Sequence, residues 1–240
     1  MEFDRPLIPA TLIRRYKRFL ADVTLNDGRE VTAHVANPGS MLGMKDAGMR
    51  VWLEPNDNPK RKLKYSWKLA ELDDGALIGV DTSLPNKIVD EALRANAIPG
   101  LDYTNIRPEV KYGENSRVDF LLMQDGRRDC YLEVKSVTLL RTKGLAEFPD
   151  SVTKRGAKHM EELACMVKAG HRAVLLFLVQ RNDATSFNVA GDIDPEYLRA
   201  FTKAIKAGVE VYCYDTSVSN QGICFGKKLE ITLPLVRAVD

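Results

Sequence analysis

The chain has 240 residues, of which 45% are hydrophobic and 28% charged, and its formal net charge is only +2. This is the composition of an ordinary globular protein, long enough for one large domain or two small ones. No run of about 18 apolar residues occurs, so we expect no membrane partner. Neither half of the chain carries a large net charge, so nucleic-acid binding would have to come from local clusters of basic residues.

The compartment is inferred from the first twenty residues and from the cysteines. The start, MEFDRPLIPATLIRRYKRFL, places acidic residues ahead of its apolar ones and lacks the hydrophobic region of a signal peptide. The cysteines are far apart in the sequence, with no close pair for zinc or redox chemistry: Cys130, Cys165, Cys213 and Cys224. We therefore expect a cytoplasmic protein whose cysteines are reduced and lie in the core.

The first third of the sequence has the pattern of short β-strands separated by turns. RRYKRFLADVTL at 14–25 is expected as one strand, and later strands are bounded by NDG, NPGS, PNDNP and DDG. Five strands at this spacing predict a small β-sandwich or a β-barrel, and the sequence alone does not choose between them.

From about residue 84 the pattern changes to helices alternating with strands. Helices are predicted at 86–97, 150–169 and 195–208, each with apolar residues on one side. Strands are predicted in RPEVKYG, SRVDFLLM, RDCYLEVKSVTLL, AVLLFLV and VEVYCYD, with KLEITL from residue 228 as a possible last strand. This order indicates an α/β domain, and we place the domain boundary near residues 82–86.

A glutamate and a lysine lie two residues apart in the middle of the apolar stretch YLEVKSVTLL, at Glu133 and Lys135. Buried charges need a partner or a metal ion, so this pair is a candidate functional site. Glu-x-Lys by itself is a weak signal, because Glu109 and Lys111 form a second copy that we expect to be an edge pair. The alternative is a structural ion pair on a solvated face of the sheet.

Asp119 distinguishes the first copy from the second. Alternation places Val118, Phe120 and Leu122 on one face of their strand and Asp119 on the other. A three-residue loop ending in a left-handed Gly126 would align the apolar faces of the hairpin and put Asp119 opposite Tyr131, diagonal to Glu133. We therefore predict an odd-numbered loop and one surface that carries Asp119, Glu133 and Lys135.

Two neighbouring carboxylates repel each other unless a cation lies between them. A small set of oxygen ligands suits Mg²⁺ or Mn²⁺, so Asp119 and Glu133 are predicted metal ligands. Lys135 would hold a phosphate oxygen or orient the attacking water. This set suits phosphodiester hydrolysis, and Asp119, Glu133 and Lys135 are our candidate catalytic residues.

The residues resemble a known family. Asp119 followed by Glu133-x-Lys135, on a helix, three strands, a helix and a strand, resembles the PD-(D/E)XK nuclease superfamily, although Val118 stands where the motif has proline. The whole chain resembles the sugar fermentation stimulation protein A family. The matching stretches are HVANPGSM, NPKRKLKYSW, RVDFLL, YLEVKSVTL and FPDSVTKRGAKHMEEL.

The resemblance implies an OB-like β-barrel over residues 1–84 and a restriction-endonuclease-like α/β domain with a central mixed sheet over 85–240. It implies DNA binding without sequence preference and a regulatory role in sugar metabolism. The superfamily often adds an acid from the first helix, and Glu91, beside the apolar arc of that helix, is our third metal ligand. A solvated helix acid is the alternative.

Three clusters are candidates for nucleic-acid binding, and the one with the least pattern is Arg14, Arg15, Lys17 and Arg18. In strand geometry one face of KLKYSWKL and the residue before it would carry a row of lysines, namely Lys60, Lys62, Lys64 and Lys68. An edge strand protected by lysines is the alternative. The aromatic residues of this stretch point the other way, towards the core. The second cluster is Arg155, Lys158 and His159 near the start of the second helix, where backbone N–H groups favour phosphate; a solvated helix face is the alternative.

The sequence thus predicts a DNA-binding protein with a nuclease-like Mg²⁺ or Mn²⁺ site. The rival hypothesis is a non-catalytic DNA-binding regulator that keeps the fold, and a metal-free structural protein is a third. RNA in place of DNA, single or double strands, and the oligomeric state are left open by the sequence.

Overall fold

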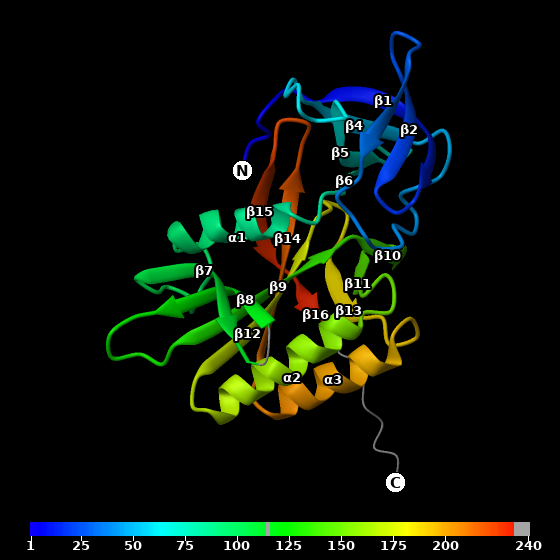
Figure 1. Ribbon diagram of the computed structural model, residues 1–240. Coiled ribbons are helices and arrows are strands. Elements are labelled where there is room, and N and C mark those ends of the chain that lie inside the picture. Colours follow the sequence, from blue (N-terminus) through cyan, green and yellow to red (C-terminus); the bar gives the residue numbers. More distant parts are fainter. Residues whose placement is uncertain (114–115, 233–240) are drawn as a thin grey trace.

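The computed structural model describes residues 1–113 and 116–232, which form a β-barrel followed by an α/β unit (Figure 1). The barrel strands are β1 (Ile8–Tyr16), β2 (Leu20–Leu25), β3 (Glu30–His34), β4 (Arg50–Pro55) and β5 (Tyr65–Glu71), with β6 (Leu77–Gly79) at the edge. β2 pairs with β3 and β1, β1 with β4, and β4 with β5, and a parallel pairing of His34 with Ser66 closes the ring. This strand order is that of an OB-type barrel. Of the two folds that the sequence left open, the structure has the barrel and not the sandwich.

Strand alternation fills the barrel with apolar side chains. In β2 the side chains of Ala21, Val23 and Leu25 are buried, and the residues between them are partly exposed. Trp67 of β5 is fully buried, and its indole N–H donates to the carbonyl oxygen of Leu69 at 2.8 Å. The prediction that the aromatic residues of this stretch turn towards the core is confirmed for Trp67.

The stretch predicted as one strand at 14–25 is two strands joined by a tight turn, so that prediction was wrong. Lys17 and Arg18 adopt positive φ angles of 47° and 64°, and the ladder resumes with Tyr16 paired to Leu20. Left-handed conformations usually call for Gly, Asn or Asp, and none of these residues marks the turn. Its sequence therefore reads as uninterrupted strand.

The α/β unit is built on a six-stranded mixed sheet in the order β15-β14-β12-β9-β8-β7. The strands are β7 (Asn105–Tyr112), β8 (Ser116–Met123), β9 (Cys130–Val137), β12 (Arg172–Val179), β14 (Glu210–Val218) and β15 (Ile223–Lys228). β9, β12 and β14 run parallel to one another. The remaining neighbours pair in antiparallel fashion: β15 with β14, β8 with β9, and β7 with β8. Three helices cover the sheet: α1 (Leu84–Arg94), α2 (Lys154–Lys168) and α3 (Pro195–Lys206).

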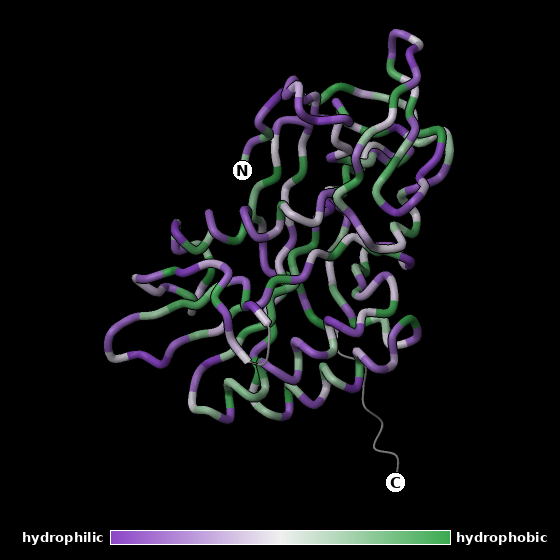
Figure 2. The backbone as a smooth tube through the Cα atoms, viewed as in Figure 1, coloured by the Kyte–Doolittle hydropathy of each residue, from purple (hydrophilic) through white to green (hydrophobic). Residues whose placement is uncertain are grey.

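β12 shows why the centre of the sheet is a continuous apolar run. Its side chains at 174, 176 and 178 pack into the cluster that contains α1, and those at 173, 175, 177 and 179 pack into the cluster of α2 and α3. Because helices cover both faces of the strand, its side chains are apolar on both sides and do not alternate between apolar and polar. Figure 2 shows the hydrophobic residues gathered along these central strands.

A second, four-stranded sheet was missed by the sequence analysis. Its order is β10 (Leu139–Thr142), β11 (Leu145–Phe148), β13 (Ser186–Val189) and β16 (Glu230–Ile231). Strands of two to four residues are too short to show a clear period of two. The last predicted strand therefore shortens to β16, and Leu233 lies outside the described residues.

Hydrogen bonds join the barrel to the α/β unit. β6 ends at Gly79, whose N–H donates to the carbonyl oxygen of Gln180 at 2.8 Å, and α1 begins five residues later at Leu84. In the loop after β3, Ser40 Oγ donates to the carbonyl oxygen of Asp150 at 2.7 Å, and the N–H of Met41 donates to the Asp150 carboxylate at 3.1 Å. Two stretches 110 residues apart in sequence thus form one contact between the domains, which we call the joint: residues 39–41 with Asp150.

Two further expectations concern the cysteines and the membrane. All four cysteines are free, but only Cys130 and Cys213 are buried, whereas Cys165 and Cys224 are exposed, so the prediction of four core cysteines was wrong for two of them.

Among the described residues, no helix has the length and hydropathy needed to cross a lipid bilayer.

The joint predicts that Gly39→Ala destabilises the protein. An added Cβ would lie 2.5 and 2.8 Å from the two carboxylate oxygens of Asp150, so the loop would have to move. We expect the free energy of unfolding to fall by about 1–3 kcal/mol, measured by urea denaturation. In a double-mutant cycle with Asp150→Ala the cost of Gly39→Ala should shrink, and strict additivity would contradict this contact.

Candidate functional site

The β8–β9 hairpin brings Asp119 and Glu133 together in a register shifted by two residues from the predicted one. The ladder pairs Phe120 with Leu132, Leu121 with Tyr131 and Leu122 with Cys130, which leaves an odd loop over 123–129. The odd loop and the left-handed Gly126, with a φ of 75°, are confirmed. The three-residue length was wrong, and continuing the observed register by one residue places Asp119 opposite Glu133 rather than Tyr131.

The regular ladder ends at Asp119. Its carboxylate oxygen Oδ2 accepts a hydrogen bond from the backbone N–H of Val134 at 2.7 Å, and Oδ1 accepts one from Asn86 Nδ2 of α1 at 2.8 Å. The side chain thereby replaces a backbone partner, and the alternation of β8 changes at this point. Val118 consequently packs in a different apolar cluster from Phe120 and Leu122, which corrects the prediction of one shared face.

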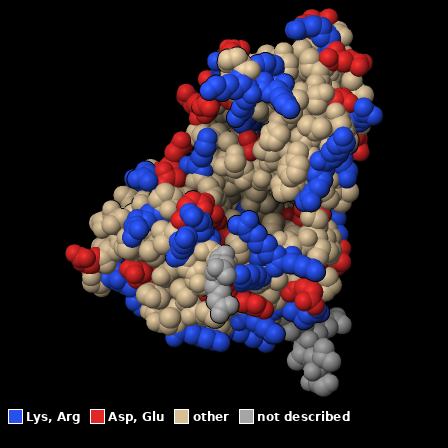
Figure 3. Space-filling model, in the orientation of Figure 1, with Lys and Arg blue, Asp and Glu red and all other residues tan. Residues whose placement is uncertain are grey.

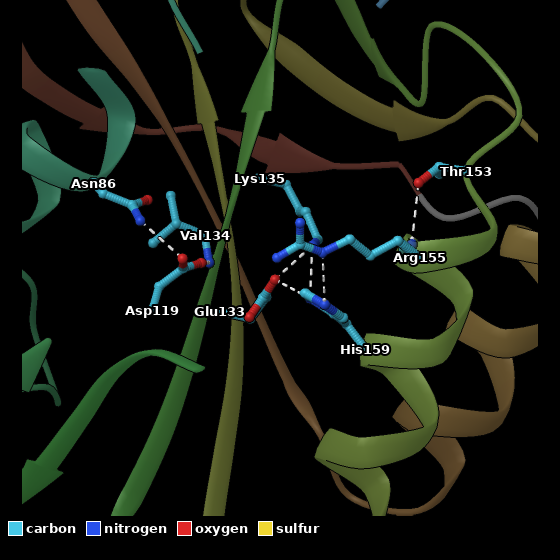
Figure 4. Close-up of polar contacts among 9 residues, drawn as sticks. Asn86, Asp119, Glu133, Val134, Lys135, Thr153, Arg155 and His159 are labelled. Atoms are coloured by element: carbon cyan, nitrogen blue, oxygen red, sulfur yellow. Dashed lines mark hydrogen bonds and ion pairs between the residues drawn. The ribbon is translucent and has the colours of Figure 1, made fainter. Parts of the chain in front are cut away.

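Glu133 lies in the interior with only one of its carboxylate oxygens satisfied. The residue is 3% exposed, and Oε1 accepts from Lys135 Nζ at 2.6 Å and contacts His159 Nδ1 (Figure 4). Oε2 is buried and has no hydrogen-bond partner among the described residues. The solvated ion pair considered from the sequence is therefore wrong, because the Glu133–Lys135 pair is buried.

His159 orients Glu133. Arg155 Nε donates to His159 Nε2 at 3.3 Å, and His159 Nδ1 contacts Glu133 Oε1 and lies 3.3 Å from Lys135 Nζ. His159 is 4% exposed and lies between Arg155 and Glu133 in the wall of the cleft, so its side chain holds the glutamate, and its role in nucleic-acid binding stays a prediction.

The two carboxyl groups have pKa values displaced in opposite directions. Burial raises the pKa of Asp119 to about 6, with a further rise from the charge of Glu133, against the hydrogen bonds from Val134 and Asn86. Burial also acts to raise the pKa of Glu133, but Lys135 and His159 outweigh it and hold that pKa below its ordinary value. Glu133 is therefore the firmly ionised member of the pair.

These residues line a cleft of about 460 Å³ between the barrel and the α/β unit. The α/β unit contributes Asp119, Glu133, Lys135, Arg155 and His159, together with residues 148–153. The barrel contributes Arg18 and residues 37–39. Figure 3 shows basic side chains gathered along the border of the hollow between the two parts. Only the two domains together make this cleft.

The predicted lysine row does not form. β5 begins at Tyr65, so Lys60, Lys62 and Lys64 are exposed residues of the preceding loop. They do not line the cleft, and the loop, cyan in Figure 1, lies at the end of the barrel far from α2. Lys68 pairs with Asp81 at 2.7 Å and with Glu54 at 3.3 Å, and its side chain is 13% exposed. Lys68 is therefore an internal ion-pair partner, which corrects its assignment to nucleic-acid binding.

The remaining candidates on the helices are separated from one another. Glu91 of α1 forms an ion pair with the amino group of Met1 at 2.7 Å and does not line the cleft. No three His, Cys, Asp or Glu side chains in the described part of the chain converge as a metal-binding group, so the predicted triad with Glu91 is not assembled. On α2, Lys158 lies 3.6 Å from Glu162 on a partly exposed surface, and Arg155 alone of the predicted basic residues reaches the cleft while remaining exposed.

Sequence reasoning missed two residues of the site. Asn86 holds Asp119 from the first turn of α1, and Asp150 holds the loop over 37–41. Asn86 follows Pro85 at a helix start, a position that signals the helix but not a contact across 33 residues of sequence. The second copy of the motif behaves as expected, since Glu109 and Lys111 lie on the edge strand β7.

Comparisons with known proteins agree with this architecture. The family model described as "Sugar fermentation stimulation protein RE domain" matches residues 83–222, and the model "SfsA N-terminal OB domain" matches residues 13–80. A sugar fermentation stimulation protein homolog of Roseobacter denitrificans is 60% identical over 93% of this chain and 96% of that protein. The homolog of Rhodospirillum centenum is 53% identical over 97% of this chain and all of that protein.

Among solved structures, that of Pyrococcus furiosus SfsA in complex with Ca²⁺ is similar. It superposes with a TM-score of 0.86 at 26% sequence identity and covers 97% of this chain and 98% of that chain. The likeness extends over both the barrel and the α/β unit.

The raised pKa of Asp119 predicts a specific pH dependence of stability. Asp119 binds its proton more tightly in the folded chain, at a pKa of about 6 against 3.8, so stability should fall as the pH rises through that interval. Glu133 acts in the opposite sense, and its contribution is lost only as the pH falls below its ordinary pKa of 4.5.

In Asp119→Asn the fall in unfolding free energy between about pH 4.5 and about pH 7 should shrink by about 1–3 kcal/mol, followed by urea denaturation in EDTA. Asp125→Asn, an exposed aspartate on the same hairpin, is the control. An unchanged fall in Asp119→Asn would contradict the burial of an acid with a raised pKa at this position.

Proposed function

The chain belongs to the sugar fermentation stimulation protein A family, and from that premise we propose a DNA-binding protein with a divalent-metal site suited to phosphodiester hydrolysis. The observation that carries the proposal is the buried, unpartnered Oε2 atom of Glu133 beside the carboxylate of Asp119 in a polar cleft. An ionised carboxylate oxygen without a donor is costly in a protein interior, and a cation would remove that cost.

The residues present fit Mg²⁺ or Mn²⁺. Such ions take one or two carboxylates and keep several waters or substrate oxygens, so Asp119 and Glu133 suffice without Glu91. The relative from Pyrococcus furiosus is described in complex with Ca²⁺, another cation that prefers oxygen ligands. The order of Asp119 and Glu133-x-Lys135 also resembles the PD-(D/E)XK nuclease motif.

In this proposal the residues of the site have distinct roles. A bound divalent ion would supply neutralisation of the charge that develops on a phosphate and a lower pKa for a bound water. Lys135, held beside Glu133, places a positive charge where a phosphate oxygen would enter the cleft. His159 and Lys135 both bind Oε1 of Glu133, so Oε2 is the oxygen left for the ion.

One observation favours the non-catalytic DNA-binding regulator as a second candidate. Lys135 Nζ is 2.6 Å from Glu133, and its side chain is 13% exposed, so the lysine is engaged within the protein. The names of the relatives connect the family with sugar fermentation, which a regulator of metabolism would also explain.

Cleavage assays on labelled DNA with Mg²⁺ or Mn²⁺ separate the two candidates. We expect the wild-type protein to cut, and Glu133→Gln and Lys135→Gln to lose at least about a hundredfold in rate. The matched controls are Glu109→Gln and Lys111→Gln, the second Glu-x-Lys copy on the edge strand, which should cut normally. Cutting that survives in both site variants would remove the site from the reaction.

Binding of DNA is tested apart from cutting. In EDTA, the logarithm of the association constant should fall linearly with the logarithm of salt concentration, because basic side chains displace counterions from phosphates. Salt-dependent binding without any cleavage would support the regulator, and the absence of binding would contradict both candidates.

His159 provides a test of how Glu133 is positioned. The side-chain amide of Asn can donate from nearly the place of the histidine Nδ1, whereas Ala cannot. We expect His159→Ala to weaken Mn²⁺ binding about 10–100-fold by titration calorimetry, and His159→Asn to retain most of the affinity. Equal affinities of wild type and His159→Ala would show that this hydrogen bond does not orient the ligand.

A further inference from the structure

Exposed apolar side chains border the cleft. The large hydrophobic residues that are exposed in the described part of the chain are Phe19, Leu42 and Val152, at 44%, 48% and 67%. Val152 lines the cleft, Phe19 follows the lining residue Arg18, and Leu42 follows Met41, whose N–H binds Asp150. Exposed apolar side chains in and next to the segments that form a polar cleft indicate a surface that contacts something besides water.

The turn that presents Arg18 and Phe19 is held in an unusual conformation. Lys17 and Arg18 are both left-handed, a conformation that is costly for residues with long side chains. Arg15 supports the turn and the facing loop, because its Nη2 donates to the carbonyl oxygens of Arg18, Asn37 and Gly39. The guanidinium of Arg18 lies 5.9 Å from the centre of the Phe19 ring. An exposed arginine that lines the cleft and an exposed aromatic ring are thus kept together.

The width of the cleft is set by contacts between the two domains. Ser40 and Met41 bind Asp150 on one side, and Gly79 binds Gln180 on another. A Cβ on Gly39 would already overlap the Asp150 carboxylate, so the loop and the α/β unit are in close contact. Opening the cleft would break these hydrogen bonds, two of which are partly buried, so they hold the cleft as a slot.

The dimensions of this slot select the substrate. A volume of about 460 Å³ is that of a small-molecule pocket, with room for roughly one or two nucleotides. Glu133 at its base is 3% exposed, so a phosphate reaches it only by entering the slot. An unpaired strand can bend its backbone into such a recess more easily than a strand held in a duplex, which must first unpair.

The charges on the walls fit a sugar–phosphate backbone. Arg18 stands on the barrel side and Arg155 on the α2 side, both exposed at the cleft. The planar guanidinium group matches the oxygens of a phosphate, and an aromatic ring beside it can stack on any base. Backbone contacts from two sides with stacking at the mouth form a recognition mode for unpaired strands.

We propose that the cleft between the barrel and the α/β unit binds one unpaired nucleic-acid strand, with Arg18 and Arg155 on its phosphates and Phe19 stacked on a base. This inference rests on the proposed function, since it names the form of nucleic acid that reaches Glu133. The shared chemistry is that of single-stranded DNA and single-stranded RNA.

Fluorescence anisotropy in EDTA tests the proposal with three labelled probes of about 12 nucleotides: oligo-dT, oligo-rU and a blunt duplex. We expect at least one of the single strands to bind about tenfold or more tightly than the duplex. Phe19→Ala should weaken single-strand binding by about tenfold, from the loss of one stacking contact. Arg18→Gln should weaken it and lower the salt slope by about one.

The matched control is Arg29→Gln, an exposed arginine in the β2–β3 turn of the same barrel, remote from the cleft residues. It should bind as wild type does. Equal affinity for duplex and single strands, or wild-type affinity in both Phe19→Ala and Arg18→Gln, would overturn the proposed slot while leaving DNA binding in place. Failure of all three probes to bind would contradict the proposed function itself.

Discussion

The Glu133 carboxylate is the feature on which the site depends. It is buried in β9, next to the apolar strand β12, and a charge in that position needs compensation worth several kcal/mol. Lys135 and His159 supply part of it, and they do so at the same oxygen atom. As a result Oε1 of Glu133 has two partners, whereas Oε2 has no hydrogen-bond partner among the described residues. Asp119, beside Glu133, accepts one hydrogen bond at each carboxylate oxygen and keeps a raised pKa.

The barrel and the α/β unit act as one structure around this pair. The barrel contributes Arg18 and the loop over 37–39 to the walls, and Asp150 before α2 holds that loop in place. The OB-type fold usually binds its ligands through strand faces and loops of the barrel. Here the turn between β1 and β2 is directed to the neighbouring domain, whereas the lysine-rich loop before β5 lies away from it. The cleft therefore combines a turn and a loop of the barrel with the ionised groups of the α/β unit.

The fold followed closely from the pattern of residues wherever the pattern was long. The apolar run of β12, the amphipathic helices α2 and α3, and the eight residues of β8 were all recognisable. Short elements were not. The β1–β2 turn has no glycine or asparagine, and the strands of the small second sheet are too brief to show a period. The predicted row of lysines was wrong because the strand begins only at Tyr65, and Lys68 then meets Asp81 and Glu54 inside the protein.

The sequence by itself determined which strands carry Asp119, Glu133 and Lys135 and that an odd loop joins the hairpin. The alternation of β8 predicted the neighbourhood of Asp119 and Glu133, although that alternation changes at Asp119 itself. Only the tertiary structure decided the rest. The register moved by two residues, His159 turned inward to Glu133, and Glu91 paired with the amino group of Met1. Local periodicity specifies direction within one element, but contacts between elements far apart in sequence depend on how helices and loops pack. The walls of the cleft come from residues more than 100 positions apart, and no local pattern records their meeting.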